Sequence, residues 1–329
     1  MVANLPLSQH QLCLPNIDLI ESSEQAFSNA FFKAAQILCH YLEQIKLSIE
    51  FTEDFTKDPF NLALLDLFSK MCRNYYSYVL LEIHHDWIGS QFLIEHLCEA
   101  AITLTYLVEK VDESLFYEYI SASAHQADRL LIDVEDQLRK FPNHSDLLTL
   151  RDQLETFITK QQKHATERPL TACSEAYLWG PDEADTTAKR GSALGLNFLT
   201  NPTRQIALKV IPASWLELQL SYSNSFAESS RAKAKSGIGF TDLRDAAHLC
   251  LHATQTFLEE VVNHQNVNFP SIELQQELLN VLYEWFHNAY HVYQLRCCAK
   301  TQEKDDCKSS YLLTLETLEA PSRLGKIFS

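Results

Sequence analysis

Glycine is scarce in this chain, and its scarcity limits the folds open to it. Seven of the 329 residues are glycine, about 2%, whereas soluble proteins use about 7%. Sheet proteins need glycine in tight turns and bulges, and helical proteins need far less of it. The composition therefore favours an all-α fold, a multi-helix bundle.

Apolar residues recur at three- and four-residue steps through most of the chain, as they do on the buried face of a helix. A clear case is the series Phe27, Phe31, Leu38, Leu42 and Ile45. This periodicity predicts helices over about 18–50, 59–83, 91–110, 113–140, 144–164, 240–262 and 271–298. The apolar positions of the second helix nearly encircle it, which predicts a central, buried element.

The ends of several helices can also be predicted from the sequence. Asp58 can cap the free backbone amides of the second helix, and Pro59 suits its first position because proline has no amide to satisfy. Gly89 and Ser90 are expected to break the chain before the third helix. Thr241 or Asp242 can cap the helix that begins near residue 240.

The helices are expected to form a single domain over 1–329, with a helical core at about 18–165 and 203–300. Glycine and proline punctuate 166–202, which is therefore predicted to be irregular, and 300–329 forms a charged tail. The helices over 113–140 and 144–164 are predicted to pair as an antiparallel hairpin with one apolar seam. Its residues are Leu131, Val134, Leu138, Leu147, Leu150, Leu154 and Phe157.

Charge and cysteine usage bear on the compartment. The net charge is −16, and a strongly acidic chain repels nucleic acid. The first residues lack the basic and apolar stretches of a secretory signal, and the longest apolar run is about half the ~20 residues of a membrane span. The nine cysteines have no scaffold-like spacing, and Cys39, Cys72, Cys98 and Cys250 fall on apolar helical faces. These features predict a cytoplasmic protein in a reducing compartment.

Positive charge gathers in one part of this acidic chain. Between residues 186 and 240 the only anions are Glu217 and Glu228. Such a segment can dock an acidic partner, or it can pair with the acidic remainder of the chain. Its cations are the candidate partner-binding residues: Lys189, Arg190, Arg204, Lys209, Arg231, Lys233 and Lys235.

Two Glu-x-x-His pairs, Glu82 with His85 and Glu284 with His287, raise the question of a metal centre. Residues three apart share a helix face, and bundles with a dinuclear iron or manganese centre use two such pairs with further glutamates. Glu95 or Glu99 could supply one of those. With 13 histidines in the chain, such spacings also arise by chance. His84 and His85 are equally explained as a solvated helix end.

A helical ribonuclease of the HEPN type is a further alternative. That class carries an arginine and a histidine on one helix, separated by four to six residues. The stretch from Arg244 to His248 has three intervening residues, and the stretch from Arg139 to His144 has four but contains a proline. Histidine in such a site would act as an acid or base. The motif in its usual form is absent.

The block from Leu80 to Ser123 resembles a bacterial all-helical family catalogued as a domain of unknown function. The resemblance covers about residues 60–260 and rests on Glu95 or Glu99, Tyr106, Phe116 and Tyr119 in two successive helices. The family's serine-rich segment is similar to "SYSNSFAESS" here, with Phe226 where a histidine is expected. The resemblance implies an all-helical fold and no activity.

No Walker loop, dinucleotide fingerprint or G-x-S-x-G motif occurs in the sequence. The first functional prediction is therefore a non-enzymatic binding or regulatory protein with a protein partner, with no cofactor and in a setting such as stress or defence. The alternatives are a metal-dependent helical-bundle oxidase at Glu82, His85, Glu284 and His287, and a divergent ribonuclease at Arg244 and His248. Oligomeric state is left open.

Overall fold

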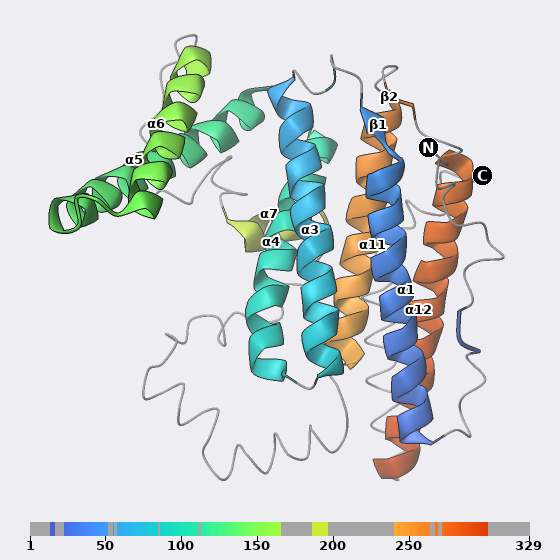
Figure 1. Cartoon of the computed structure of the whole chain (residues 1–329). Coiled ribbons are helices and arrows are strands. Elements are labelled where there is room, and N and C mark those ends of the chain that lie inside the picture. Colours follow the sequence, from blue (N-terminus) through green and yellow to red (C-terminus); the bar gives the residue numbers. More distant parts are fainter. Residues whose placement is uncertain are drawn as a thin grey trace, which may run out of the picture. The chain divides into compact units, whose positions relative to one another are not determined.

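The computed structural model describes residues 14–16, 23–51, 55, 58–84, 86–110, 113–165, 186–196, 240–263, 267–268 and 272–301. Helices make up nearly all of this part of the chain (Figure 1), so the all-α prediction is confirmed. The predicted helix around 214–223, the tail after residue 301 and the cap at Asp112 lie outside the described residues.

The chain divides into two compact units, and the single domain over 1–329 stays a prediction. The first unit comprises Met1–Leu104 and Gly195–Ser329, and the second comprises Thr105–Leu194. The physical reason lies in α5 (Glu113–Lys140) and α6 (Ser145–Ala165) of the second unit, which pack chiefly on each other. A hairpin that buries its apolar seam between its own two helices needs few apolar contacts with the rest of the chain.

In the first unit, α1 (Glu24–Ser48) and α3 (Pro59–Ile83) pack together as the sequence predicts. Asp58 caps α3 and accepts a hydrogen bond from the Phe60 amide at 3.0 Å, which confirms the predicted start. The predicted start of α1 at residue 18 is wrong, because Ser23 is extended and caps the helix by accepting from the Ala26 amide. The apolar face of α1 is buried from Phe27 to Ile45.

The prediction that α3 is a central helix, buried by apolar positions that nearly encircle it, is wrong on one side. Leu62, Tyr76 and Leu80 are exposed, although α3 packs on both α1 and α11. The break before α4 (Trp87–Lys110) also differs from the prediction, because Gly89 and Ser90 lie inside its first turn. Asp86 makes the cap instead, and its Oδ1 accepts from the Gly89 amide at 3.0 Å.

Gly89 explains how the turn between α3 and α4 closes. A Cβ atom at this position would lie 2.9 Å from Asp86 Oδ2 and 3.1 Å from Leu81 Cδ1. A side chain at this position would require the Asp86 carboxylate or the Leu81 side chain to shift. Glycine therefore allows the capping carboxylate to approach the first turn of α4 as closely as it does.

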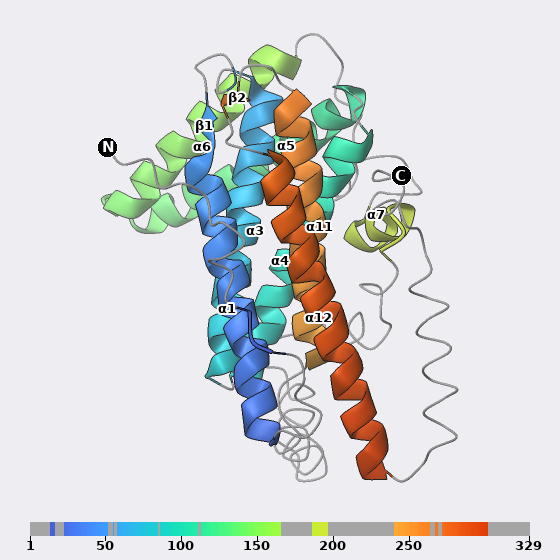
Figure 2. The ribbon, with the colours of Figure 1, turned by 90° about the vertical axis from the view of Figure 1, so that its right-hand side faces the viewer.

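The remaining helices of the first unit are α11 (Phe240–Asn263) and α12 (Ile272–Thr301), which lie side by side (Figure 2). Two short strands join the loops at one end, where β1 (Glu50–Phe51) pairs antiparallel with β2 (Val267–Asn268). Because Phe240 is already helical, Thr241 and Asp242 lie in the first turn of α11 and the prediction that one of them caps it is wrong.

Aromatic rings fill the core between α1, α11 and α12. Phe31 of α1 lies 5.1 Å from Phe240 and 5.6 Å from both Trp285 and Phe286, measured between ring centroids. Phe240 in turn contacts Tyr293 at 4.9 Å. Trp285 and Phe286 are both buried, so α12 contributes large rings to this core.

The second unit contains α5, α6 and the short helix α7 (Thr187–Ala193), which begins at the Thr186 cap inside the segment predicted to be irregular. Figure 1 shows α5 and α6 as an antiparallel hairpin, which confirms that prediction. Its seam differs in one place. Ile158 is buried, whereas Phe157 is 36% exposed and lies beside the seam.

Three cysteines predicted on apolar faces, Cys39, Cys72 and Cys250, are buried thiols in the first unit. Burial raises the pKa of the Cys39 and Cys72 thiols to about 12, so both stay protonated and unreactive at neutral pH. Among the helices that the structure describes, none combines the length and apolarity of a membrane crossing.

Candidate functional site

The candidate site is a group of polar residues between α11 and α12, called the polar cluster below. Polar side chains on one face of α11 meet polar and aromatic side chains of α12, because the two helices run antiparallel next to each other. The members are Thr241, Arg244, Asp245, His248, Tyr283, His287 and Tyr290.

A buried ion pair lies at the centre of the polar cluster. Arg244 donates to Asp245 Oδ1 from Nε at 2.8 Å and also from Nη2. Both residues are less than one tenth exposed. The Arg244 guanidinium also lies 3.8 Å from the centroid of the Tyr290 ring, and the Tyr290 hydroxyl is 3.2 Å from that of Thr241. Arg244 is therefore held on two sides, while Nη1 stays outside the ion pair.

His248 lies one helical turn after Arg244 and is 8% exposed. Its ring stacks on that of Tyr283, with 4.3 Å between the centroids. Its Nε2 atom is buried and has no hydrogen-bond partner in the part of the chain that the structure describes. A buried polar atom without a partner costs about 1–3 kcal/mol, so such atoms are rare in native proteins and call for an explanation.

Burial and the charge of Arg244 both act on the histidines of the polar cluster. Burial lowers the pKa of His248 to about 3, and the nearby charges of Arg244 and His287 lower it further. Burial also lowers the pKa of His287, again with help from Arg244 and from His291. At neutral pH His248 is therefore uncharged, and the site resists any added positive charge.

A separate acidic contact lies where the end of α3 meets the starts of α4 and α11. Glu82 is buried, and the Ser90 hydroxyl donates to its Oε1 at 2.5 Å. Burial raises the pKa of Glu82, and the charge of Asp242 raises it further. His84, which was expected at a solvated helix end together with His85, is exposed after the last turn of α3, and His85 lies outside the described residues.

We predict that Glu82→Gln stabilises the protein increasingly as pH rises above about 4.5. The unfolded carboxyl ionises there first, while the folded one keeps its proton, so wild-type stability falls with rising pH by up to about 1.4 kcal/mol per unit. Glutamine still accepts from Ser90 and cannot ionise. Thermal unfolding of both proteins between pH 4 and 8 checks this. A difference that does not change with pH would contradict it.

The four candidate metal ligands are not brought together in the part of the chain that the structure describes. Glu82 is buried against Ser90, Glu284 is exposed, and His287 faces Arg244. His85 lies outside the described residues. No group of three or more histidine, cysteine, aspartate or glutamate side chains suited to a metal occurs among the described residues. Glu95 and Glu99 are exposed.

The structure describes two of the candidate partner-binding cations, Lys189 and Arg190. Lys189 is exposed on α7, whereas Arg190 is 2% exposed and donates to Thr187 Oγ1 at 3.3 Å. Of these two cations, only Lys189 is therefore exposed to a partner in this structure. Arg204, Lys209, Arg231, Lys233 and Lys235 lie outside the described residues.

The sequence analysis singled out four of the seven residues of the polar cluster. Thr241 was named as a possible cap, and Arg244, His248 and His287 were named in two unrelated motifs. Asp245, Tyr283 and Tyr290 were missed, although the polar spacing of Thr241, Asp245 and His248 on an otherwise apolar helix is a visible signal. Nothing in the sequence links this face of α11 to α12.

No protein-family model matches the chain, and no curated protein or solved structure matches it. The resemblance over residues 60–260 therefore stays a prediction. Within that block Tyr106 and Phe116 are buried, and Tyr119 is half-buried.

Proposed function

We propose that this protein is a non-enzymatic binding or regulatory protein, and that its ligand enters the polar cluster between α11 and α12. The observation that carries the proposal is His248 Nε2, a buried polar atom without a partner beside a buried ion pair. A ligand that meets this nitrogen would remove the cost of leaving it unpaired.

Stability alone is a poor reason for such a cluster. A buried ion pair is often no better than well-packed apolar residues of similar volume, because both charges lose their hydration. Strongly shifted pKa values and buried charges are found preferentially at functional sites. The polar cluster combines both features in a helix pair whose other faces are packed with aromatic rings.

Binding fits the geometry better than catalysis by the ribonuclease alternative. Arg244 and His248 do share one face of α11, as that alternative requires. However, the Nε and Nη2 donors of Arg244 bind Asp245. Fewer N–H groups of the guanidinium therefore remain for a phosphodiester. A histidine with a pKa of about 3 is also a weak base and is rarely protonated at neutral pH.

The proposal places the protein in a reducing, cytoplasmic compartment. The buried thiols of Cys39, Cys72 and Cys250 support this setting, because they act as small apolar side chains in the core. A regulatory role would follow if ligand binding between α11 and α12 changed a surface that a protein partner recognises. Stress or defence is one process compatible with that role.

We predict that His248→Phe changes the stability of the ligand-free protein by less than about 1 kcal/mol and abolishes ligand binding. Phenylalanine keeps the stack on Tyr283 and removes the unpaired nitrogen, but it also loses the hydrogen bond between His248 and the Tyr283 backbone. Urea unfolding measures the stability. Mass spectrometry of small molecules released from natively purified protein measures binding, and a compound should be stoichiometric with wild type and missing from the variant.

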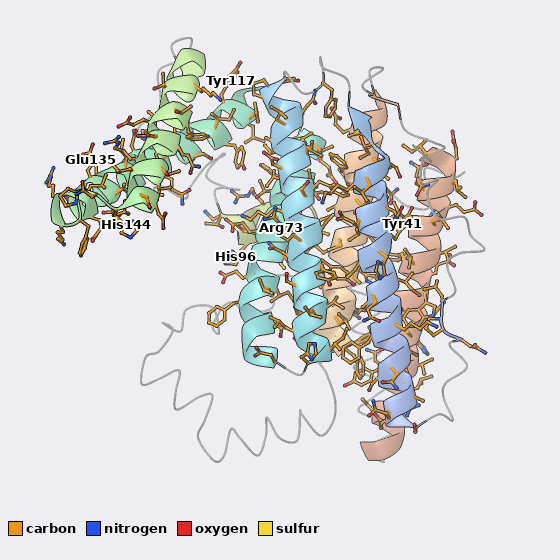
Figure 3. The ribbon with its side chains drawn as sticks, viewed as in Figure 1. Tyr41, Arg73, His96, Tyr117, Glu135 and His144 are labelled. Atoms are coloured by element: carbon orange, nitrogen blue, oxygen red, sulfur yellow. The ribbon has the colours of Figure 1, made fainter. Side chains whose placement is uncertain are left out.

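Tyr41→Phe is the matched control, because Tyr41 (Figure 3) is also buried but its hydroxyl has partners. It donates to the backbone oxygen of Gln275 at 2.9 Å and lies 2.7 Å from Gln275 Oε1. This control should lose about 1 kcal/mol and keep the ligand. If His248→Phe is destabilised like the control and no compound is released from wild type, His248 has a structural role and the proposal fails.

A further inference from the structure

We propose that one side of α3 is the interface of a homodimer, in which the α3 helices of two copies of this chain pack antiparallel. This inference goes beyond the ligand of the polar cluster and concerns a different surface. The spacing of the residues on this side, their apolar side chains and their charges each support it. The residues, called the α3 row below, are Leu62, Asp66, Ser69, Arg73, Tyr76 and Leu80.

The α3 row follows the spacing of a coiled-coil seam. Its members are separated by four, three, four, three and four residues, and this alternation keeps one line of side chains facing a partner helix. Since successive residues turn by about 100°, the whole row lies within about 40° of one line along the helix. The buried residues Leu64, Met71 and Tyr75 lie on the other side of α3. Five members of the row are exposed, and Ser69 is half-buried.

Apolar side chains lie toward both ends of the α3 row. Leu62 is 38% exposed, Leu80 is 42% exposed and Tyr76 is 56% exposed. Single exposed apolar residues are common on soluble proteins. Three of them on one line at this spacing are typical of a helix that packs on another helix. Antiparallel packing places Leu62 of one copy opposite Leu80 of the second copy, so the leucines at both ends are removed from water.

The charges of the α3 row favour a second copy of the chain and decide its orientation. Asp66 lies in the first half of the row and Arg73 in the second half (Figure 3), and both are exposed. In a parallel pair each residue would face its own counterpart, so like charges would meet. In an antiparallel pair Asp66 of one copy lies opposite Tyr76 of the second copy and next to its Arg73.

Two-fold symmetry repeats each of these contacts, because Arg73 of the first copy likewise lies next to Asp66 of the second copy. The middle layers then hold opposite charges and a phenol that can donate to a carboxylate. Polar residues within a seam lower the stability of the pair but fix its register. The α3 row is therefore complementary to itself in one orientation.

Sedimentation velocity of the full chain tests this inference. The seam is short for a stable interface, so we expect a reversible dimer with a dissociation constant on the order of 10 µM, measured between about 1 and 200 µM protein. Asp66→Arg should weaken the dimer about tenfold or more, because two attractive contacts become repulsive. The double variant Asp66→Arg with Arg73→Asp exchanges the charges and should restore the dimer. Both positions are exposed, so the variants should fold.

Asp136→Arg is the matched control, since it makes the same change of charge on α5 at a side chain that is 55% exposed, and it should leave the dimer unchanged. A wild type that stays monomeric at the highest concentration would overturn the inference. So would a dimer that Asp66→Arg weakens no more than Asp136→Arg does, or a double variant that associates no better than Asp66→Arg. None of these outcomes bears on the ligand of the polar cluster.

Discussion

Asp245→Asn is expected to lower the free energy of unfolding by about 3–5 kcal/mol, because it leaves the buried Arg244 guanidinium without its counter-charge. Arg244 is always protonated, so loss of its proton cannot remove the free-energy cost of burying an unpaired charge. Its stack on Tyr290 remains, but a cation over a ring recovers only about 0.5–2 kcal/mol. Urea unfolding measures the effect as a lower midpoint at an unchanged slope.

Two comparisons separate this effect from a general loss of charge. Asp136→Asn breaks the exposed pair with Arg139, whose nitrogen and oxygen are 2.9 Å apart, and should cost less than about 1 kcal/mol. The double variant Arg244→Met with Asp245→Leu removes both buried charges and should be close to the wild type in stability. An Asp245→Asn variant as stable as Asp136→Asn would mean that Arg244 is solvated, and the polar cluster would not be a buried site.

His248 should make the protein lose stability in mild acid. Its pKa is about 3 when folded, against 6.5 ordinarily, so the unfolded chain binds a proton between these values and the folded chain does not. The contribution of His248 to the free energy of unfolding is fully present above pH 6.5 and is lost as pH falls toward 3. Each pH unit in this window costs about 1.4 kcal/mol, so the loss from pH 6.5 to 5 is about 2 kcal/mol.

The difference between the wild type and His248→Phe isolates this contribution. Both proteins share every other titrating group, including Glu82, whose raised pKa acts in the opposite direction. The stability of the wild type relative to the variant should fall steadily from pH 6.5 to 5 and stay level above pH 7.5. A difference that is flat across the whole range would show that His248 takes up a proton equally well in both states and is not buried as described.

The sequence predicted local structure well where a single residue decides it. Asp58 and Pro59 define the start of α3 because a cap and a missing amide act within one turn. Predictions failed where a neighbour across the fold decides. Gly89 looked like a helix breaker, but it lies in the first turn of α4 because Asp86 caps the helix before it and accepts from the Gly89 amide. Tyr76 and Leu80 looked buried, but they are exposed on α3.

The candidate site shows the same difference between features decided locally and features decided by distant residues. Arg244 and His248 could be chosen as polar residues on an apolar helix, but their partners could not. Tyr283, His287 and Tyr290 are about 40 residues away, and they meet the α11 face only because α12 returns antiparallel beside it. The candidate metal ligands Glu82 and Glu284 likewise differ in a way that the sequence does not show, since Glu82 on α3 is buried and Glu284 on α12 is exposed.

The sequence by itself determined the class of fold. Glycine is scarce and apolar residues recur at three- and four-residue steps, and both features specify helices because they act within a few residues of chain. What only the tertiary structure decided is which polar residues share a buried environment. The cost of burying Arg244, Asp245 and His248 depends on what α12 places beside them, and that is a property of packing between helices distant in the chain.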